Sequence, residues 1–126
     1  MAEAGGGAYF FLMGEAPAKG ESPAHAERHI MTLDPFLVNL ADKDSRRYLK
    51  VKLDLEVPNE KAAKELEKSL PRLRDATILL LSSKSYADIS TSEGKLQLKQ
   101  QLLQQMTGLP GGKKIHGVFF TEFVAQ

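Results

Sequence analysis

Hydrophobic and polar residues alternate most regularly between Leu49 and Val57, where each residue between two apolar ones is Lys, Asp or Glu. This period of two predicts a β-strand over residues 48–57 with one buried and one solvated face. Residues 29–41 are also β-prone, but Asp34-Pro35 interrupts them, and proline lacks the N–H that a central strand needs. We therefore expect two short strand pieces with a kink, paired with the following strand as an antiparallel hairpin.

Helical patterns follow. Asn59 is a favoured N-cap, and the strong helix formers after it predict a helix over residues 60–69. Pro71 is accepted in a first helical turn but costs about 3 kcal/mol in a helix interior, so it marks the start of a second helix over residues 71–82. This second helix becomes almost entirely apolar toward its end and is expected to be buried.

A third helix is expected to open at Ser90, because Glu93 three residues later completes a reciprocal capping box. Its apolar side chains fall on one arc of a helical wheel and its glutamines occupy the rest, so one face should pack on the sheet. The members of the arc are Leu96, Leu98, Leu102, Leu103 and Met106.

The chain ends in an apolar and aromatic run over residues 115–125. Because this run is apolar on both faces, it is predicted to be an interior strand. The order strand, strand, helix, helix, helix, strand predicts an α+β fold with an antiparallel or mixed sheet covered by three helices.

Composition divides the chain near residue 28. Residues 1–27 hold four glutamates against Lys19 alone, with abundant Ala, Gly and Pro, and are predicted to be a poorly packed linker. Residues 28–126 carry the periodic apolar pattern and are predicted to form one domain. Residues 8–13 are six consecutive apolar residues, whereas a membrane helix needs about 20. They fit a segment packed on the domain surface or the outer end of a truncated membrane helix. A secretory signal is disfavoured, because no basic region precedes the run.

Charge and cysteine content exclude several functions. The net charge is +1 with both signs interspersed, which disfavours general nucleic-acid binding, since that requires clustered Lys and Arg. The chain has no cysteine, so disulfides, thiolate catalysis and cysteine-ligated zinc or iron-sulfur sites are excluded.

Two features of the sequence are candidate binding sites. Gly94-Lys95 resembles the end of a phosphate-binding loop, but the positions that should hold Gly and Ser or Thr are Ile89 and Leu96. Gly94 is therefore interpreted as a small residue in a first helical turn. The three histidines lack the helical i, i+4 spacing that would bring two of them onto one metal ion. They are His25, His29 and His116.

Carboxylates are the remaining candidates for chemistry. Two acidic pairs lie among Lys and Arg and are interpreted as solvated, salt-linked surface. These pairs are Asp42 with Asp44, and Glu65 with Glu67. Asp75, beside Arg72 and Arg74, is the most suggestive acid, yet an ion pair within or between helices is its expected role. The sequence thus predicts no catalytic, cofactor-binding or metal-binding residue and no enzyme.

Five separated motifs occur in a characteristic order along residues 30–126. They are Leu33-Asp34-Pro35-Phe36 with Asn39-Leu40, Arg47-Tyr48-Leu49-Lys50-Val51, Arg74-Asp75 ahead of Leu79-Leu80-Leu81-Ser82-Ser83-Lys84, Thr91-Ser92-Glu93-Gly94-Lys95, and Phe120-Thr121-Glu122-Phe123-Val124-Ala125-Gln126. Together they resemble the FliL family of flagellar basal-body-associated proteins.

The resemblance implies a single-pass protein of the bacterial inner membrane, with residues 28–126 in the periplasm at the flagellar basal body and residues 8–13 as the end of a transmembrane helix. It also implies a domain similar to the stomatin and prohibitin (SPFH-like) type, which assembles into homo-oligomeric rings. The implied partners are the ion-channel stator complex, other copies of the chain and the inner membrane, with no cofactor and no nucleic acid.

The function implied by the resemblance is stabilisation of the stator units, which supports flagellar rotation, swimming, swarming and chemotaxis. The residues alone leave open a small-ligand or peptide-binding α+β domain unrelated to the motor and, more weakly, a hydrolase.

Overall fold

The computed structural model describes residues 28–44 and 46–126, so the expectations for residues 1–27 lie outside the described residues. The strands are β1 (His29–Thr32), β2 (Phe36–Asn39), β3 (Tyr48–Val57) and β4 (Gly117–Ala125). The helices are α2 (Glu60–Glu67), α3 (Leu70–Ser82), α4 (Tyr86–Ile89), α5 (Ser92–Thr107) and the single 3₁₀ turn η1 (Gly112–Lys114). The fold is α+β, as the sequence predicts.

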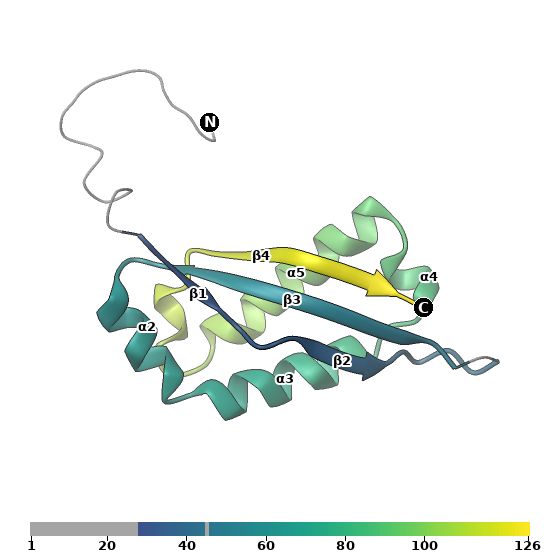
Figure 1. The fold of residues 1–126 in the computed structure, drawn as a ribbon, viewed down its shortest axis with the longest axis horizontal. Helices are drawn as coiled ribbons and strands as arrows, with labels where there is room; N and C mark the ends of the chain where they lie inside the picture. The colour runs from purple at the N-terminus through teal and green to yellow at the C-terminus, as the bar shows by residue number, and fades with distance from the viewer. Residues whose placement is uncertain (1–27, 45) are drawn as a thin grey trace, which may run out of the picture.

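The sheet is antiparallel throughout and is organised around β3 (Figure 1). β1 and β2 lie end to end along one edge of β3, with the kink at Asp34-Pro35 between them, and β4 lies along the other edge. The predicted strand pieces and the hairpin of β2 with β3 are therefore confirmed. β4 and β3 share this sheet, in agreement with the single sheet that the sequence predicts.

The prediction that the last strand lies inside the sheet is wrong. Within the described residues β4 pairs with β3 alone, so it is an edge strand. Its outward-pointing Phe119 and Val124 are exposed rather than covered by a second layer. Apolar residues on both faces of a strand indicate an interior position only where both faces are covered.

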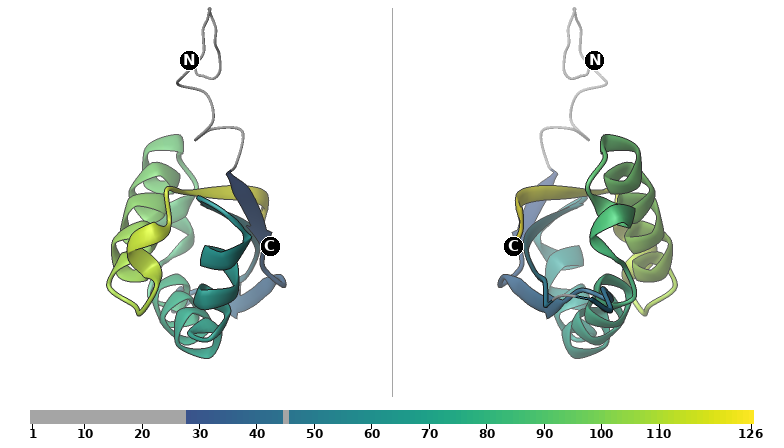
Figure 2. Two further views of the ribbon diagram at one scale, coloured as in Figure 1. Left: turned by 90° about the vertical axis from the view of Figure 1, so that its left-hand side faces the viewer. Right: turned by 90° about the vertical axis from the view of Figure 1, so that its right-hand side faces the viewer.

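The core lies between β3 and the helices. Leu49, Leu53 and Leu55 on the inward face of β3 are completely buried. Figure 2 shows the described helices on one side of the sheet; none of the described helices or strands covers its other face. On α5, Leu98 and Leu102 are buried in this core, which confirms that the helix packs with one face on it.

Two apolar residues expected in the core lie on the surface. Leu96, predicted on the buried arc of α5, is 58% exposed. Leu79 on α3 is 64% exposed, so the expectation that the apolar end of this helix is wholly buried is wrong. Only one stripe of α3, including Leu73 and Leu81, faces the core, because a helix of 3.6 residues per turn cannot bury four successive residues against one layer.

Helix starts agree with the sequence for α2 and α3 but differ for the third predicted helix. The Asn59 side chain accepts the Ala62 N–H at 2.9 Å, and Pro71 lies in the first turn of α3. The reciprocal capping box is formed by Ser85 and Asp88 at the start of α4, a helix that the sequence did not predict. The N-cap of α5 is Thr91, not Ser90.

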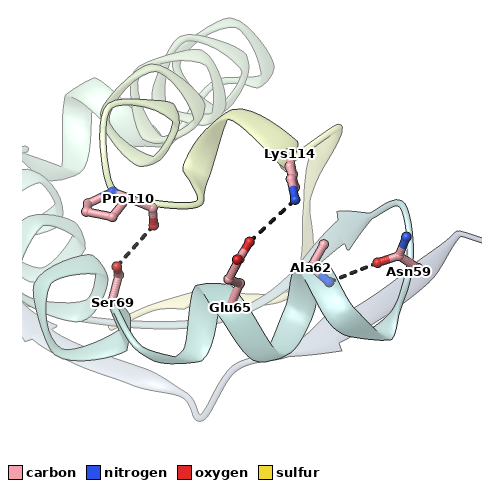
Figure 3. Close-up of polar contacts among 6 residues, drawn as sticks. All are labelled: Asn59, Ala62, Glu65, Ser69, Pro110 and Lys114. Carbon is pink, nitrogen blue, oxygen red and sulfur yellow. Dashed lines mark hydrogen bonds and ion pairs between the residues drawn. The ribbon is translucent and has the colours of Figure 1, made fainter.

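The connection from α5 to β4 is fastened by polar contacts to α2 and to the N-cap of α3 (Figure 3). The buried Ser69 hydroxyl donates to the Pro110 carbonyl at 3.0 Å, and Lys114 Nζ lies 3.4 Å from Glu65 Oε1. These contacts join segments 41 and 49 residues apart in the sequence. They fix the point at which the chain returns to the sheet as β4.

Candidate functional site

The open face of the sheet carries a row of apolar and charged side chains. Alternation along β3 directs Tyr48 and Lys50 to this face, because the intervening Leu49 is buried in the core. Lys50 lies opposite Leu37 of β2 on one side and Val124 of β4 on the other. We call the face the outer sheet face and define it by Ile30, Leu37, Tyr48, Lys50, Phe119, Glu122 and Val124.

Apolar side chains on the outer sheet face remain open to solvent. Leu37 is 71% exposed, and Tyr48 and Val124 are 44% and 40% exposed. Between them Lys50 Nζ lies 3.6 Å from Glu122 Oε1. These side chains and Gln126 line a hollow of about 290 Å³. Clustered apolar groups around a solvated ion pair are typical of a protein contact surface rather than of a buried ligand site.

A second hollow of about 220 Å³ adjoins the first at Tyr48. Arg46 and Arg47 line it together with Asn39 and Leu40. The Arg47 guanidinium lies 4.2 Å over the centroid of the Tyr86 ring, which ties the turn before β3 to α4. The outer sheet face therefore has a basic border at this end.

The acidic pairs singled out in the sequence do not form a reactive site. Asp42 Oδ2 accepts the Tyr86 N–H at 3.0 Å and so caps the start of α4. Glu65 pairs with Lys114 of η1. Asp44 and Glu67 are exposed. The interpretation of Glu65 as salt-linked surface is confirmed, and Asp42 has a structural role instead.

Asp75 has no cationic partner within ion-pair distance among the described residues, so the expected ion pair is wrong. The neighbouring Arg74 points instead to the kink between β1 and β2, where its guanidinium donates to the carbonyls of Asp34 and Pro35 at 2.8 and 3.0 Å. Asp75 is exposed, and an exposed ion pair contributes little stability, so the guanidinium gains little by turning from the two carbonyls to this carboxylate.

The histidines do not converge in the part of the chain that the structure describes. His29 opens β1 and His116 precedes β4, while His25 lies outside the described residues. No cluster of three or more His, Asp or Glu side chains suited to a metal ion occurs within residues 28–44 and 46–126.

Gly94-Lys95 serves helix packing. The Thr91 hydroxyl accepts the Gly94 N–H at 2.9 Å, and Lys95 Nζ donates to the Ser90 carbonyl at 3.3 Å. A Cβ on Gly94 would lie 2.0 Å from the Asp88 carbonyl oxygen, so only glycine permits α4 to approach α5 this closely. This agrees with the interpretation of Gly94 as a small residue in a first helical turn.

Asp88 has the one clear pKa shift among the described residues. The Ser85 N–H donates to its carboxylate at 2.9 Å and lowers the pKa of Asp88 below the ordinary aspartate value; the Ser85 hydroxyl and the Lys84 charge act in the same direction. The carboxylate is fully exposed and stabilises a helix start. Its shift reflects capping rather than catalysis.

The sequence did not predict the outer sheet face, although it contains a signal for it. Phe36, Leu37 and Val38 are three consecutive apolar residues in β2, and β4 is apolar on both faces. Such strands have either two covered faces or one exposed apolar face, and the sequence did not distinguish these cases.

Among the described residues no helix has the length and apolar character needed to span a membrane. What they form is a small α+β domain, with one sheet face in its core and the other open to contact.

Comparison with known proteins identifies the family. The family described as "Flagellar basal body-associated protein FliL" matches residues 30–126. The chain is 41% identical over 92 residues to Flagellar protein FliL of Aquifex aeolicus and 33% identical over 94 residues to Flagellar FliL protein of Caulobacter vibrioides. It is 25% identical over 124 residues to Flagellar protein FliL of Bacillus subtilis. The chain belongs to the FliL family, which confirms the resemblance.

Coverage differs among these relatives. The matches take in 73% and 74% of this chain but 57% and 46% of the Aquifex and Caulobacter proteins, so the chain spans about half their length. The Bacillus match takes in 96% of this chain and 86% of that protein. Family membership makes this a flagellar basal-body-associated protein connected with motility, in a family described by its place in the flagellum rather than by a reaction.

Proposed function

We propose that this chain is a non-enzymatic motor protein that oligomerises around the flagellar stator units and stabilises them, supporting rotation in swimming and swarming. The observation that carries the proposal is the outer sheet face, where Leu37, Tyr48 and Val124 are exposed beside the Lys50–Glu122 ion pair in a protein of the basal body. A rigid sheet presents these groups in a fixed arrangement, which favours contact with another folded protein.

Stabilisation of the stator follows from differential binding. A protein that binds the engaged stator better than the idle one shifts that equilibrium by the difference in affinity and by no more. A ring of copies makes small interfaces sufficient, since each further contact forms at high effective concentration after the first. We propose such a homo-oligomeric ring, with an SPFH-like arrangement of domains. The placement of the helices of residues 46–126 on one side of the sheet supports it, because none of these elements occupies the other side.

The proposed location is the periplasmic side of the inner membrane. Residues 28–126 form the periplasmic domain, and residues 1–27 are a linker that starts with the end of a single membrane-spanning helix. The support is the apolar run at residues 8–13 and the glutamate-, alanine- and proline-rich stretch after it.

The proposed absence of catalysis is supported by the structural roles of the candidate residues. Asp42, Gly94 and Asp88 each serve a helix start or a helix contact. We expect the chain to unfold at the same temperature with and without EDTA, because no metal-binding free energy is linked to its folding. A large drop in melting temperature on adding EDTA would count against this part of the proposal.

The motor role is tested by counting labelled stator units per motor, and measuring torque at high load, with and without the full-length protein. We expect fewer stator units and lower torque without it, while filaments still assemble. Equal occupancy and equal torque would reject the motor role in favour of an unrelated ligand-binding or peptide-binding domain. For such a domain a small-molecule pocket of about 300–1,000 Å³ is usual, and the larger hollow described above lies at the lower limit.

The surface is tested separately with two leucines of similar exposure. Leu37→Glu places a charge on the outer sheet face, and Leu79→Glu places the same charge on α3 in the helix layer. We expect Leu37→Glu to lower stator number toward that of the deletion strain and Leu79→Glu to leave it unchanged. Equal behaviour of the two variants would remove the outer sheet face from the motor role.

A further inference from the structure

β4 leaves one edge of the sheet open within the described residues, since it pairs with β3 alone. Tyr48 and Gln126 exchange two backbone hydrogen bonds of 2.9 and 2.8 Å across these strands. Residues of an antiparallel pair alternate between bonded and non-bonded positions, so the N–H and C=O groups of Ala125 and Phe123 point away from β3. The free edge of β4, which runs along Gly117–Ala125 and includes Phe123 and Ala125, therefore offers donors and acceptors to a further strand.

Lys99 of α5 lies beside this edge. Its Nζ atom is 6.0 Å from the centroid of the Phe119 ring and 5.7 Å from that of Phe120. Phe119 is on the outer sheet face and Phe120 is on the helix-covered face, because they pair with Asp54 and Leu53. The Lys99 ammonium is near both rings, which lie on opposite faces of the sheet. It must therefore lie beyond an edge of β4, and this is the free edge, because β3 lies along the other edge.

Lys95, one helical turn earlier, adds a second positive charge on the helix-covered side of β4, because Phe123 pairs with the buried Val51. Its Nζ atom lies 5.1 Å from the centroid of the Phe123 ring. Figures 1 and 2 show the first turns of α5 rising past β4 on the helix side of the sheet. Among the described residues neither Lys95 nor Lys99 has a carboxylate within ion-pair distance. The edge thus combines unused backbone hydrogen-bonding groups with two cations held by aromatic rings.

We propose that the free edge of β4 binds an extended acidic peptide segment, which joins the sheet as a further strand and places its carboxylates against Lys95 and Lys99. Backbone hydrogen bonds provide affinity in such strand addition, and charge complementarity selects the partner. This inference stands apart from the proposed motor function, because it concerns the edge of the sheet and not the outer sheet face.

A second copy of the chain fits this edge poorly. If two β4 strands paired about a two-fold axis, each copy would bring Lys95 and Lys99 to the same seam. Like charges opposed across strands are destabilising, so the lysines act against self-pairing and for an acidic partner. Alternatively, the lysines only prevent edge-to-edge aggregation of copies of the chain. The test distinguishes this role from peptide recognition.

The test measures binding of a labelled, end-blocked peptide of alternating valine and glutamate to the 126-residue chain by fluorescence anisotropy. The matched peptides carry glutamine or lysine in place of glutamate. Ala125→Pro removes a free-edge donor without removing a bond to β3, and Lys99→Glu reverses the charge. Lys61→Glu, at an exposed position on α2, is the control. We expect about tenfold weaker binding for both edge variants, which is about 1.4 kcal/mol, and no change for the control.

Any one of four results would overturn the inference. The first is equal binding of the glutamate and lysine peptides, and the second is no binding of the glutamate peptide. The other two concern the variants. Ala125→Pro, with an unchanged melting temperature, would bind the glutamate peptide as well as the unaltered chain does. Lys99→Ala would bind it unchanged and self-associate in sedimentation experiments, in which case the lysines are guards of the edge and not a recognition site.

Discussion

The guanidinium of Arg74 lies 4.0 Å over the centroid of the Phe36 ring. The same guanidinium donates to the carbonyls of Asp34 and Pro35, so one side chain of α3 holds the kink that separates β1 from β2. Phe36 itself is 1% exposed and is part of the core. The broken edge strand is thus fastened both to the helix layer and to the core.

Arg74→Ala should destabilise the domain by about 2 kcal/mol, because two charge-assisted hydrogen bonds and one cation–π contact are lost at a partly solvated site. The measurement is the free energy of unfolding in urea. Arg72→Ala, two residues away at an exposed position, is the control and should change it by less than about 0.5 kcal/mol. Equal effects of the two changes would show that Arg74 does not hold the kink.

Leu102→Asp should destabilise the domain by several kcal/mol, roughly 3 or more, because it buries an unpaired charge in the core that α5 shares with the sheet. The matched change Leu96→Asp, on the exposed side of the same helix, should be nearly neutral. Melting temperatures of the two variants test this directly. A Leu102→Asp protein that melts like the unaltered chain would contradict the packing of α5 described here.

Gly94→Ala should destabilise the domain by about 1–3 kcal/mol, although alanine is the better helix former. Its Cβ would meet the backbone of Asp88, which cannot move without displacing α4 from α5. Gly108→Ala, where the nearest atom is 3.5 Å from the added Cβ, should be neutral or slightly stabilising. Thermal unfolding of both variants decides the question; a stabilised Gly94→Ala protein would disprove the close approach.

The ionised form of Asp88 should contribute stability at neutral pH that disappears in acid. Its pKa is lower in the folded chain than in the unfolded chain, so its contribution is present above the unfolded value of about 3.9 and is lost as pH falls through the folded value. The measurement compares unfolding of the unaltered chain and Asp88→Asn across this range. We expect the unaltered chain to be more stable at pH 7 and the gap to close below about pH 4.

Ser85→Ala tests whether the capping box lowers the pKa of Asp88. It removes the hydroxyl that lowers the pKa of Asp88 but keeps the backbone N–H, so an NMR titration should place this pKa between its value in the unaltered chain and the ordinary aspartate value. A stability gap independent of pH, together with an unchanged titration in Ser85→Ala, would show that the capping box does not set the charge of Asp88.

The sequence determined the features that depend on neighbouring residues. The alternation over residues 48–57 gave β3 and its buried face, Pro35 gave the break in the edge strand, and Asn59 and Pro71 marked two helix starts. Each follows from backbone stereochemistry or from a period of apolar positions, and these are local properties. The ordered motifs also carried the family membership.

Tertiary structure alone decided which apolar residues are covered. Leu37 and Leu79 are as apolar as Leu49, yet only Leu49 faces the core, because burial depends on whether another layer lies against that face. Among the described residues no further strand pairs with β4 and no layer covers the outer sheet face, so β4 is an edge strand and that face is open. Tertiary structure also placed Lys99 beside the free edge of β4 and Arg74 at the kink. These contacts join segments about 20 and 40 residues apart, and no local sequence pattern specifies them.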